Sequence, residues 1–343
     1  MENPRATLEY LLDRRDLSET AAASLLNALT DPQLSPVLAG ALLIALRAKG
    51  VTAGEVRGFA RAMRALARQP VLPGAGAAID IVGTGGDASG SLNLSTGAAL
   101  LTAACGLPVI KHGNRSISSR SGSADVIELL GFGLPLDEAM AARCFAATGF
   151  TFLFAPYYHP AMKALAPVRN ALGVRTLLNL LGPLTNPAAP RFYLIGAYNA
   201  AAAELMASTL AGMDIERAWV VHGAGGWDEA TPIGPFLAFD VTRGGVRQLQ
   251  VDPAQFGIAR CETWDLAGGD AAANLAALTA VFEGRDAGAH CSALVLQSGL
   301  ALHIAGRADS IDAGVASARA AIESGRAREW LRRLRSFAAG ALA

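Results

Sequence analysis

Short apolar segments that alternate with helical stretches constrain the fold of this chain more than any other feature. Residues 77–82, 109–111, 150–154, 192–197 and 218–221 are each typical of a buried strand. Helical runs such as 199–212 lie between them, and the pattern is helical from Ala271 onwards. Strands that alternate with helices predict an α/β fold, with a mostly parallel central sheet flanked by helices on both faces.

The first 70 residues show no such alternation and are predicted to be helical. Ser35 and Pro36 offer a helix start, and Thr52 with Glu55 has capping-box spacing. A Pro/Gly/Ala linker follows over 70–76. Helical character returns over 159–182, which we expect to pack beside the N-terminal helices. We therefore predict a small, discontinuous helical domain from 1–70 with about 159–190, and a larger α/β domain from 71–158 with about 191–343.

Composition narrows the class of protein. The chain has 29 Lys and Arg against 29 Asp and Glu, with 52% hydrophobic residues, which excludes a disordered chain and a protein that coats nucleic acid electrostatically. Neither a membrane span of about 20 apolar residues nor a signal-peptide pattern is visible. The four cysteines form no CxxC pair, so we expect reduced thiols, no structural zinc and a cytoplasmic location.

A glycine-rich motif, Gly83-Thr84-Gly85-Gly86-Asp87, directly follows the first predicted strand. Successive backbone N–H groups in such a loop can form an anion nest, although a tight strand-to-helix turn explains the glycines equally well. With Ala88 the run also fits the dinucleotide pattern GxGxxA, but no acidic residue lies about 20 residues further on. It is not a Walker A loop, because no Gly-Lys-Ser/Thr follows.

A second motif, Ser91-Leu92-Asn93-Leu94-Ser95-Thr96-Gly97, leads into an apolar helix. Ser95 or Thr96 could be a simple N-cap, or the helix N-terminus could bind phosphate. Two candidate anion sites so close together favour a phosphorylated ligand.

A third motif runs from Lys111 through Ser119 and continues with Gly122, Ser123 and Asp125. Its cations, hydroxyls and glycines suit a polyanion such as pyrophosphate, and a solvated loop would explain poorly one of only three lysines in the chain. His112 is either a general base or a structural hydrogen-bonding residue.

A fourth motif places Asp228 and Glu229 after the strand at 218–221. Adjacent carboxylates there suit Mg²⁺, which prefers oxygen ligands and phosphate-bound sites. An acidic surface turn is the alternative.

The segment 152–162 is aromatic and apolar, and Arg169 follows it. Phe152 and Phe154 are expected in the core. Arg169 suits the carboxylate of a flat aromatic acid, with a structural ion pair as the alternative.

Taken together, the motifs resemble the anthranilate phosphoribosyltransferase family. The resemblance rests on GTGGD, NLST, KHGNRSISSRSGSAD, FLFAPYYHPAMKALAPVRNALGVRT, NLLGPLTNP and VVHG…DE in this order. It implies a homodimer that joins anthranilate to phosphoribosyl pyrophosphate (PRPP), with Mg²⁺ and release of pyrophosphate, in tryptophan biosynthesis.

The resemblance also implies roles for individual residues. Lys111, Asn114 and Arg169 would be catalytic; Ser95, Asp228 and Glu229 would serve Mg²⁺; and Gly83, Asn114 and Arg169 would bind anthranilate. The residues implied for PRPP are Gly83, Gly86, Asp87, Ser91, Asn93, Leu94, Ser95, Thr96, Lys111, His112, Gly113, Asn114, Arg115, Ser116, Ile117, Ser118, Ser119 and Ser123.

Departures from the family pattern leave room for a paralogue that acts on a related aromatic acid, and two further classes of function stay open. Ala88 stands where Gly is usual, Ser91 where Thr is commoner, Trp227 where Leu is common, and Gln297-Ser298 where Asn-Ala is usual. A paralogue that acts on another aromatic acid, a pyrimidine nucleoside phosphorylase and a non-catalytic nucleic-acid-binding relative are the alternatives. The neutral charge and the intact GTGGD and Asp-Glu motifs argue against the last of these.

Overall fold

The computed structural model describes residues 3–116 and 120–341. The helices are α1 (Pro4–Leu12), α2 (Glu19–Leu29), α3 (Pro36–Lys49), α4 (Ala53–Ala65), α5 (Leu94–Ala104), α6 (Ser123–Leu129), α7 (Glu138–Thr148), α8 (Ala155–Tyr158), α9 (Met162–Leu172), α10 (Leu178–Leu184), α11 (Ala200–Leu210), α12 (Ala271–Phe282), α13 (Ala289–Ile304), α14 (Ile311–Glu323) and α15 (Arg326–Ala338). The strands are β1 (Ile79–Gly83), β2 (Val109–Gly113), β3 (Phe150–Phe154), β4 (Phe192–Gly196), β5 (Arg217–His222), β6 (Phe236–Thr242) and β7 (Gly245–Val251).

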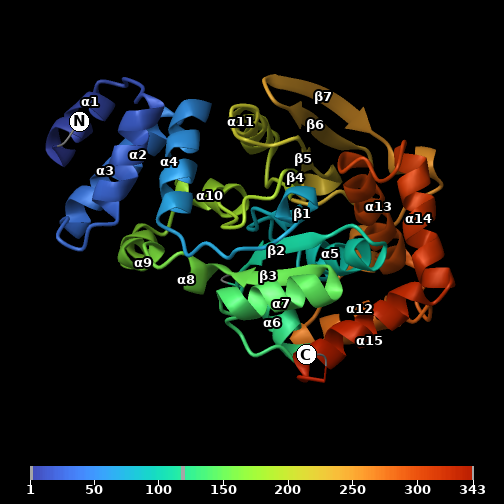
Figure 1. Ribbon diagram of the computed structural model, residues 1–343. Coiled ribbons are helices and arrows are strands. Elements are labelled where there is room, and N and C mark those ends of the chain that lie inside the picture. Colours follow the sequence, from blue (N-terminus) through green and yellow to red (C-terminus); the bar gives the residue numbers. More distant parts are fainter. Residues whose placement is uncertain (1–2, 117–119, 342–343) are drawn as a thin grey trace.

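The strands form one seven-stranded sheet in the order β3-β2-β1-β4-β5-β6-β7 (Figure 1). The five strands from β3 to β5 are parallel, which confirms the predicted mostly parallel sheet. All five predicted strands are present. Strands β6 and β7, which extend the sheet in antiparallel fashion, were not predicted from the sequence.

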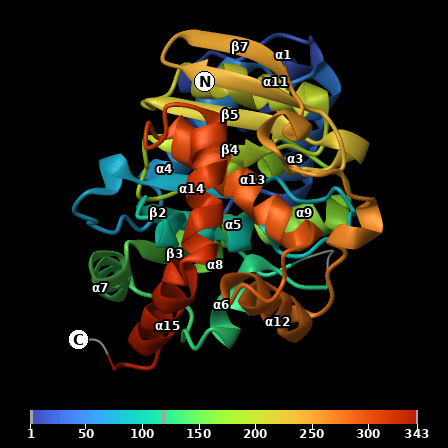
Figure 2. The same ribbon diagram turned by 90° about the vertical axis from the view of Figure 1, so that its right-hand side faces the viewer.

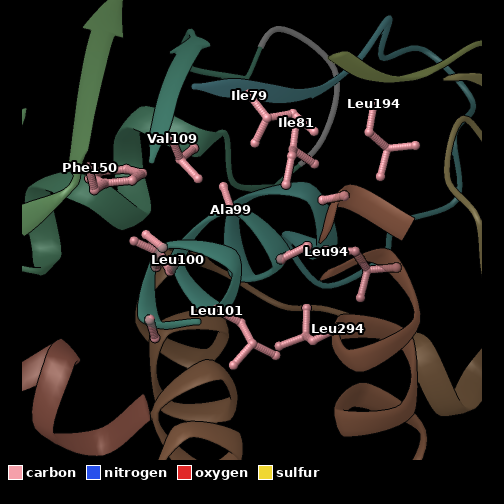
Figure 3. Packing of buried hydrophobic residues seen from close by; sticks show 14 of the residues in the cluster. Ile79, Ile81, Leu94, Ala99, Leu100, Leu101, Val109, Phe150, Leu194 and Leu294 are labelled. Atoms are coloured by element: carbon pink, nitrogen blue, oxygen red, sulfur yellow. The ribbon is translucent and has the colours of Figure 1, made fainter. Parts of the chain in front are cut away.

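Alternating side chains of the strands build two hydrophobic cores, one on each face of the sheet. On one face Ile79, Ile81 and Leu194 pack against α5, whose other side meets Leu294 of α13 (Figure 3). The helices α12–α15 gather on this side of the molecule (Figure 2). On the other face Ile195 and Val220 join a core with α11 and the N-terminal helices. Burial on both faces is why these strands read as continuous apolar runs.

The N-terminal helices form a bundle beside the sheet (Figure 1). Thr52 and Glu55 make the predicted capping box at the start of α4, whereas Ser35 occupies the N-cap position of α3 without a side-chain hydrogen bond. Helix α9 packs on α3, with Val168 and Leu172 against Gly40, as the sequence predicts for the returning helical segment. Because this core is continuous with one face of the sheet, the proposed domain boundaries stay a prediction.

No helix within the described ranges combines the length and the apolar character that crossing a bilayer requires.

Candidate active site

The candidate site lies where the chain order of the parallel sheet reverses. Strand β1 has β2 on one side and β4 on the other, and Gly83 at the end of β1 is in register with Gly196 at the end of β4. Ligands of open α/β sheets bind outside the carboxyl ends of the strands at such a switch point. The loops after β1, β2 and β5 carry three of the predicted motifs to this edge.

The loop after β1 has the backbone geometry of an anion nest. Gly85 and Gly86 have φ values of +71° and +78°, which favour glycine. Among the residues that the structure describes, the N–H groups of Gly86, Asp87 and Ala88 donate to no acceptor. Three such donors favour the nest over a turn with only a structural role. Ala88 itself has a φ of +59°, a conformation costly for a residue with a Cβ, so the departure from glycine strains this loop.

The Asp228-Glu229 pair is packed against this loop. A carboxylate oxygen of Asp228 accepts the N–H of Gly85 at 2.6 Å, and the N–H of Asp228 donates to Asp87 at 3.3 Å. A Cβ on Gly196 would lie 1.6 Å from the backbone oxygen of Asp228, so only glycine admits the loop there. Asp228 is buried, and the alternative of an acidic surface turn is therefore wrong.

Burial disfavours the charged forms of Asp228 and Glu229, which also lie close to other carboxylates. Burial and the neighbouring Asp87 raise the pKa of Asp228 to about 7. Burial and Asp228 raise the pKa of Glu229 to about 8, against the lowering effect of Lys111. A bound cation would relieve this repulsion, so the donor set fits Mg²⁺. Among the described residues no group of three or more His, Cys, Asp or Glu could hold a metal ion. Two carboxylates that share Mg²⁺ with substrate phosphates match its usual mode of binding.

Helix α5 begins beside these carboxylates. Its N-cap residue is Asn93, so the alternative that Ser95 or Thr96 caps the helix is wrong; both lie in its first turn. The N–H of Ser95 donates to Glu229 at 3.2 Å. The side chain of Asn93 is held by Ser121 and by Asn274 of α12, and Leu94 is fully buried. Thr96 is buried, and among the described residues its hydroxyl has no hydrogen-bond partner.

Lys111 lies inside β2 and not in the loop that follows it. The side chain is only 1% exposed; its ammonium donates to the backbone oxygen of Ile81 at 2.6 Å and approaches the Ser95 hydroxyl at 3.4 Å. Burial lowers its pKa, opposed by Asp80, Glu229 and Asp228. The structure thus brings the Lys111 ammonium beside the Ser95 hydroxyl. Its direct contact with pyrophosphate stays a prediction.

Asp80 is a site residue that the sequence reasoning did not select. It is fully buried in β1, and Asn186 donates to it at 2.9 Å while also bonding the backbone oxygen of Ile110. Burial raises its pKa to about 6, against the lowering effect of Lys111. A carboxylate inside the otherwise apolar strand 77–82 was the available signal.

His112 has a structural environment. Its Nδ1 lies 3.0 Å from the backbone oxygen of Gly182, and its ring makes an edge contact with His159 at 5.0 Å. Burial, with a further contribution from His159, lowers the pKa of His112 to about 3. An imidazole that stays neutral and donates to a carbonyl supports the structural alternative over the general base.

Polar contacts join the loop after β2 to helix α6. The Arg115 guanidinium pairs with Glu128, in two contacts, and with Asp125. The Ser123 hydroxyl donates to the backbone oxygen of Asn114 at 3.1 Å, and a Cβ on Gly113 would lie 2.4 Å from that hydroxyl. Ser116 is partly buried, whereas the predicted ligands Ile117, Ser118 and Ser119 lie outside the described residues.

Arg169 lies on α9 and is half-buried. In the described part of the chain it has no carboxylate partner, which argues against the structural ion pair, and burial lowers its pKa. Within the described residues its side chain makes no hydrogen bond or ion pair with the loops after β1, β2 or β5, so its role toward a ligand stays a prediction. Phe152 is in the core as expected, and Phe154 packs partly buried against it.

The remaining predicted positions and departures surround the loop after β1. Ser91 accepts a hydrogen bond from Ser89 at 3.2 Å. Trp227 is buried, Gln297 is buried close enough to Glu229 to lower its pKa, and Ser298 donates to the backbone oxygen of Ala98.

The helical bundle and the sheet with its flanking helices together match a family of glycosyl transferases. The family described as "Glycosyl transferase family, helical bundle domain" matches residues 5–67, and "Glycosyl transferase family, a/b domain" matches residues 75–328. Within this class, the anthranilate phosphoribosyltransferase of Rubrobacter xylanophilus is 44% identical over 92% of both chains. That of Desulforudis audaxviator is 44% identical over 97% of this chain and 96% of its own. The chain belongs to the anthranilate phosphoribosyltransferase family.

Solved structures agree with this assignment. The crystal structure of anthranilate phosphoribosyltransferase from Thermus thermophilus has a TM-score of 0.91 and 39% identity, covering 98% of this chain and 99% of that one. The Saccharomyces cerevisiae enzyme in complex with PRPP and Mg has a TM-score of 0.87 and 25% identity, covering 98% of each chain.

Proposed function

We propose that the protein transfers the phosphoribosyl group of PRPP to the amine of anthranilate, giving N-(5-phosphoribosyl)anthranilate and pyrophosphate, as a step of tryptophan biosynthesis. The observation that carries this proposal is the contact between the Asp228-Glu229 loop and the glycine-rich loop after β1. It places two carboxylates beside an anion nest, as a substrate that is both a polyanion and a magnesium chelate requires.

The donor substrate would lie along the loop after β1 and the start of α5. The backbone N–H groups at 86–88 would bind phosphate oxygens, and the Lys111 ammonium beside Ser95 would add positive charge. Asp228 and Glu229, with the Ser95 hydroxyl, would hold Mg²⁺, which supplies charge neutralisation for the departing pyrophosphate. The Saccharomyces cerevisiae enzyme in complex with PRPP and Mg supports the choice of these two ligands.

The acceptor would be held by Arg169, whose planar guanidinium can bind a carboxylate in bidentate fashion. Its lack of an acidic partner in the described residues leaves that charge available for a ligand. Asn114 and Gly83 would complete this side of the site.

The chemistry needs no strong base. The lone pair of the neutral aromatic amine forms the new bond to C1, the C1–oxygen bond breaks, and pyrophosphate leaves with that electron pair. The nitrogen then loses one proton to water. Positioning the amine at C1 and stabilising charge on the leaving group are the protein's contributions, and we expect an oxocarbenium-like transition state without a covalent intermediate.

A panel of substrates tests this function against its alternatives. With PRPP and Mg²⁺, anthranilate should release pyrophosphate faster than 3- or 4-aminobenzoate, and thymidine with phosphate should give no cleavage. Preference for another aromatic acid would support the paralogue, thymidine phosphorolysis would support the phosphorylase, and tight nucleic-acid binding without turnover would support the non-catalytic relative.

We also propose a homodimer formed through the helical bundle. Leu12, Val37 and Ile44 of α1 and α3 are exposed apolar side chains, between 37% and 83% accessible, which a partner subunit would cover. Sedimentation of the wild type and of a V37E/I44E variant tests this.

The four free cysteines agree with the proposed cytoplasmic location.

A further inference from the structure

Arg175 received no role in the sequence analysis, although it lies at the end of the motif FLFAPYYHPAMKALAPVRNALGVRT. It lies in the connection between α9 and α10. Its guanidinium donates a hydrogen bond to the backbone oxygen of Gly86, in the loop after β1. Its side chain is exposed, and in the described residues it has no carboxylate partner.

The guanidinium is fixed from a second direction by Tyr198. Its central carbon lies 4.1 Å from the centroid of the Tyr198 ring, a cation–π contact. The backbone N–H of Tyr198 in turn donates to the Thr84 hydroxyl at 3.1 Å. Arg175 therefore contacts the glycine-rich loop at Gly86 and, through Tyr198, at Thr84.

The bond to Gly86 has a geometric consequence for the nest. The oxygen of Gly86 and the N–H of Asp87 belong to one planar, trans peptide unit, so they point in opposite directions. An arginine that holds the oxygen on its own side turns the Asp87 N–H to the other side. That N–H is one of the three in the loop that donate to no acceptor in the described residues.

The flanking backbone would not hold this peptide unit by itself. Gly86 has a φ of +78° and follows another glycine with a positive φ, and glycine populates both signs of φ with similar ease. A Cβ on Gly86 would also lie 3.1 Å from the arginine nitrogen, so the close approach of Arg175 favours glycine here.

We propose that Arg175 is a positioning residue that fixes the Gly86–Asp87 peptide unit so that the Asp87 N–H faces the phosphate of the donor substrate. This rests on the proposed function for the identity of the ligand. The orientation of the peptide unit itself is a property of the protein alone.

The first measurement needs no ligand. The chemical shift of the Asp87 N–H is recorded for the wild type, R175A, R175K and Y198L. We expect a changed Asp87 shift in R175A, a smaller change in R175K, and an intermediate effect in Y198L. The matched control is R243A. Arg243 is an exposed arginine on the β6–β7 turn that pairs with Asp214, and its loss should leave the Asp87 shift unchanged.

The second measurement is calorimetric binding of PRPP, and of pyrophosphate alone, in the presence of Mg²⁺. Loss of one backbone hydrogen bond to a charged phosphate weakens binding roughly 10- to 100-fold. We expect the affinity of R175A for PRPP and for pyrophosphate to fall within this range, with partial recovery in R175K. Melting temperatures close to the wild type would accompany it, because the side chain is exposed. An equal loss of PRPP and anthranilate affinity with a lower melting temperature would show a merely structural role and overturn the proposal.

The two measurements separate this proposal from the proposed function. If the wild type binds neither PRPP nor pyrophosphate, the proposed function fails, while the Asp87 amide still decides whether Arg175 orients the peptide unit. An unchanged Asp87 amide in R175A overturns the inference about Arg175, whatever the ligand.

Discussion

The Asp228 carboxylate accepts the backbone N–H of Gly85 at 2.6 Å and so joins two loops that lie 143 residues apart in the chain. One loop presents N–H donors for an anion, and the other presents carboxylates for a cation. We propose that their contact builds a site for a metal-bound polyphosphate at the switch point of the sheet.

Removing both carboxyl charges should abolish magnesium-dependent turnover. The variant D228N/E229Q keeps the size of both side chains and a hydrogen-bond acceptor for Gly85, so we expect it to fold. A Mg²⁺ titration of initial rates should show activity roughly 100-fold or more below the wild type at every concentration, a loss of the size that removing one charge-stabilising group from a site produces. Wild-type activity across the titration would refute the metal assignment.

The same variant should change how stability depends on pH in metal-free protein. Burial raises the pKa values of Asp228 and Glu229 to about 7 and about 8, with further contributions from Asp87 and from Asp228 respectively, above the ordinary values near 4. The folded state then binds more protons than the unfolded state between these values, so this pair makes the free energy of unfolding rise as the pH falls. From about pH 8 to 6.5 in EDTA, the melting temperature of the wild type should rise relative to D228N/E229Q. Parallel curves would contradict the shifted pKa values.

Glycine at position 196 should be essential for the site. In G196A the Cβ would lie 1.6 Å from the backbone oxygen of Asp228, so the loop at 223–229 must move. We expect a loss of about 1–3 kcal/mol in the free energy of unfolding and a larger proportional loss of activity. G133A, whose Cβ would meet no atom within 4 Å, is the control. Equal behaviour of the two variants in denaturant melts and rate assays would show that the close approach is unimportant.

Arg169 should act on the aromatic acid. Its replacement by alanine removes no ion pair among the described residues, so the melting temperature should stay near that of the wild type. We expect a raised KM for anthranilate and a lowered kcat, because a misplaced amine loses the benefit of proximity, and only partial recovery in R169K. Steady-state kinetics with each substrate varied in turn measure this. Weakened binding of both substrates with a much lower melting temperature would favour a structural role.

His112 should prove dispensable as a base. Its pKa of about 3 and its contact with the Gly182 oxygen give it a structural task that the amide of asparagine can share. Loss of a general base costs about 10²- to 10⁴-fold, whereas we expect H112N to keep kcat within about tenfold of the wild type. A fall of the larger size with an altered pH–rate profile would restore His112 to the role of base.

Much of this fold could be predicted because strands buried on both faces of a parallel sheet have continuous apolar sequences. Strand β7 was missed because it is an edge strand that pairs only with β6 and has exposed side chains such as Arg247. Strand β6 is mostly buried and apolar like the five predicted strands, and its apolar run was overlooked. The donor-side motifs of the site were visible as residue types. Asp80 and Arg175 were present in the predicted strand and in a quoted motif, but their contacts with Asn186 and Gly86 are created only by the folded chain.

The most direct test of the account is pyrophosphate release by the purified protein with PRPP, anthranilate and Mg²⁺ together. We predict release of one pyrophosphate per phosphoribosylated anthranilate formed, dependent on all three components and absent in D228N/E229Q. Release of pyrophosphate without anthranilate, or none with all three present, would contradict it.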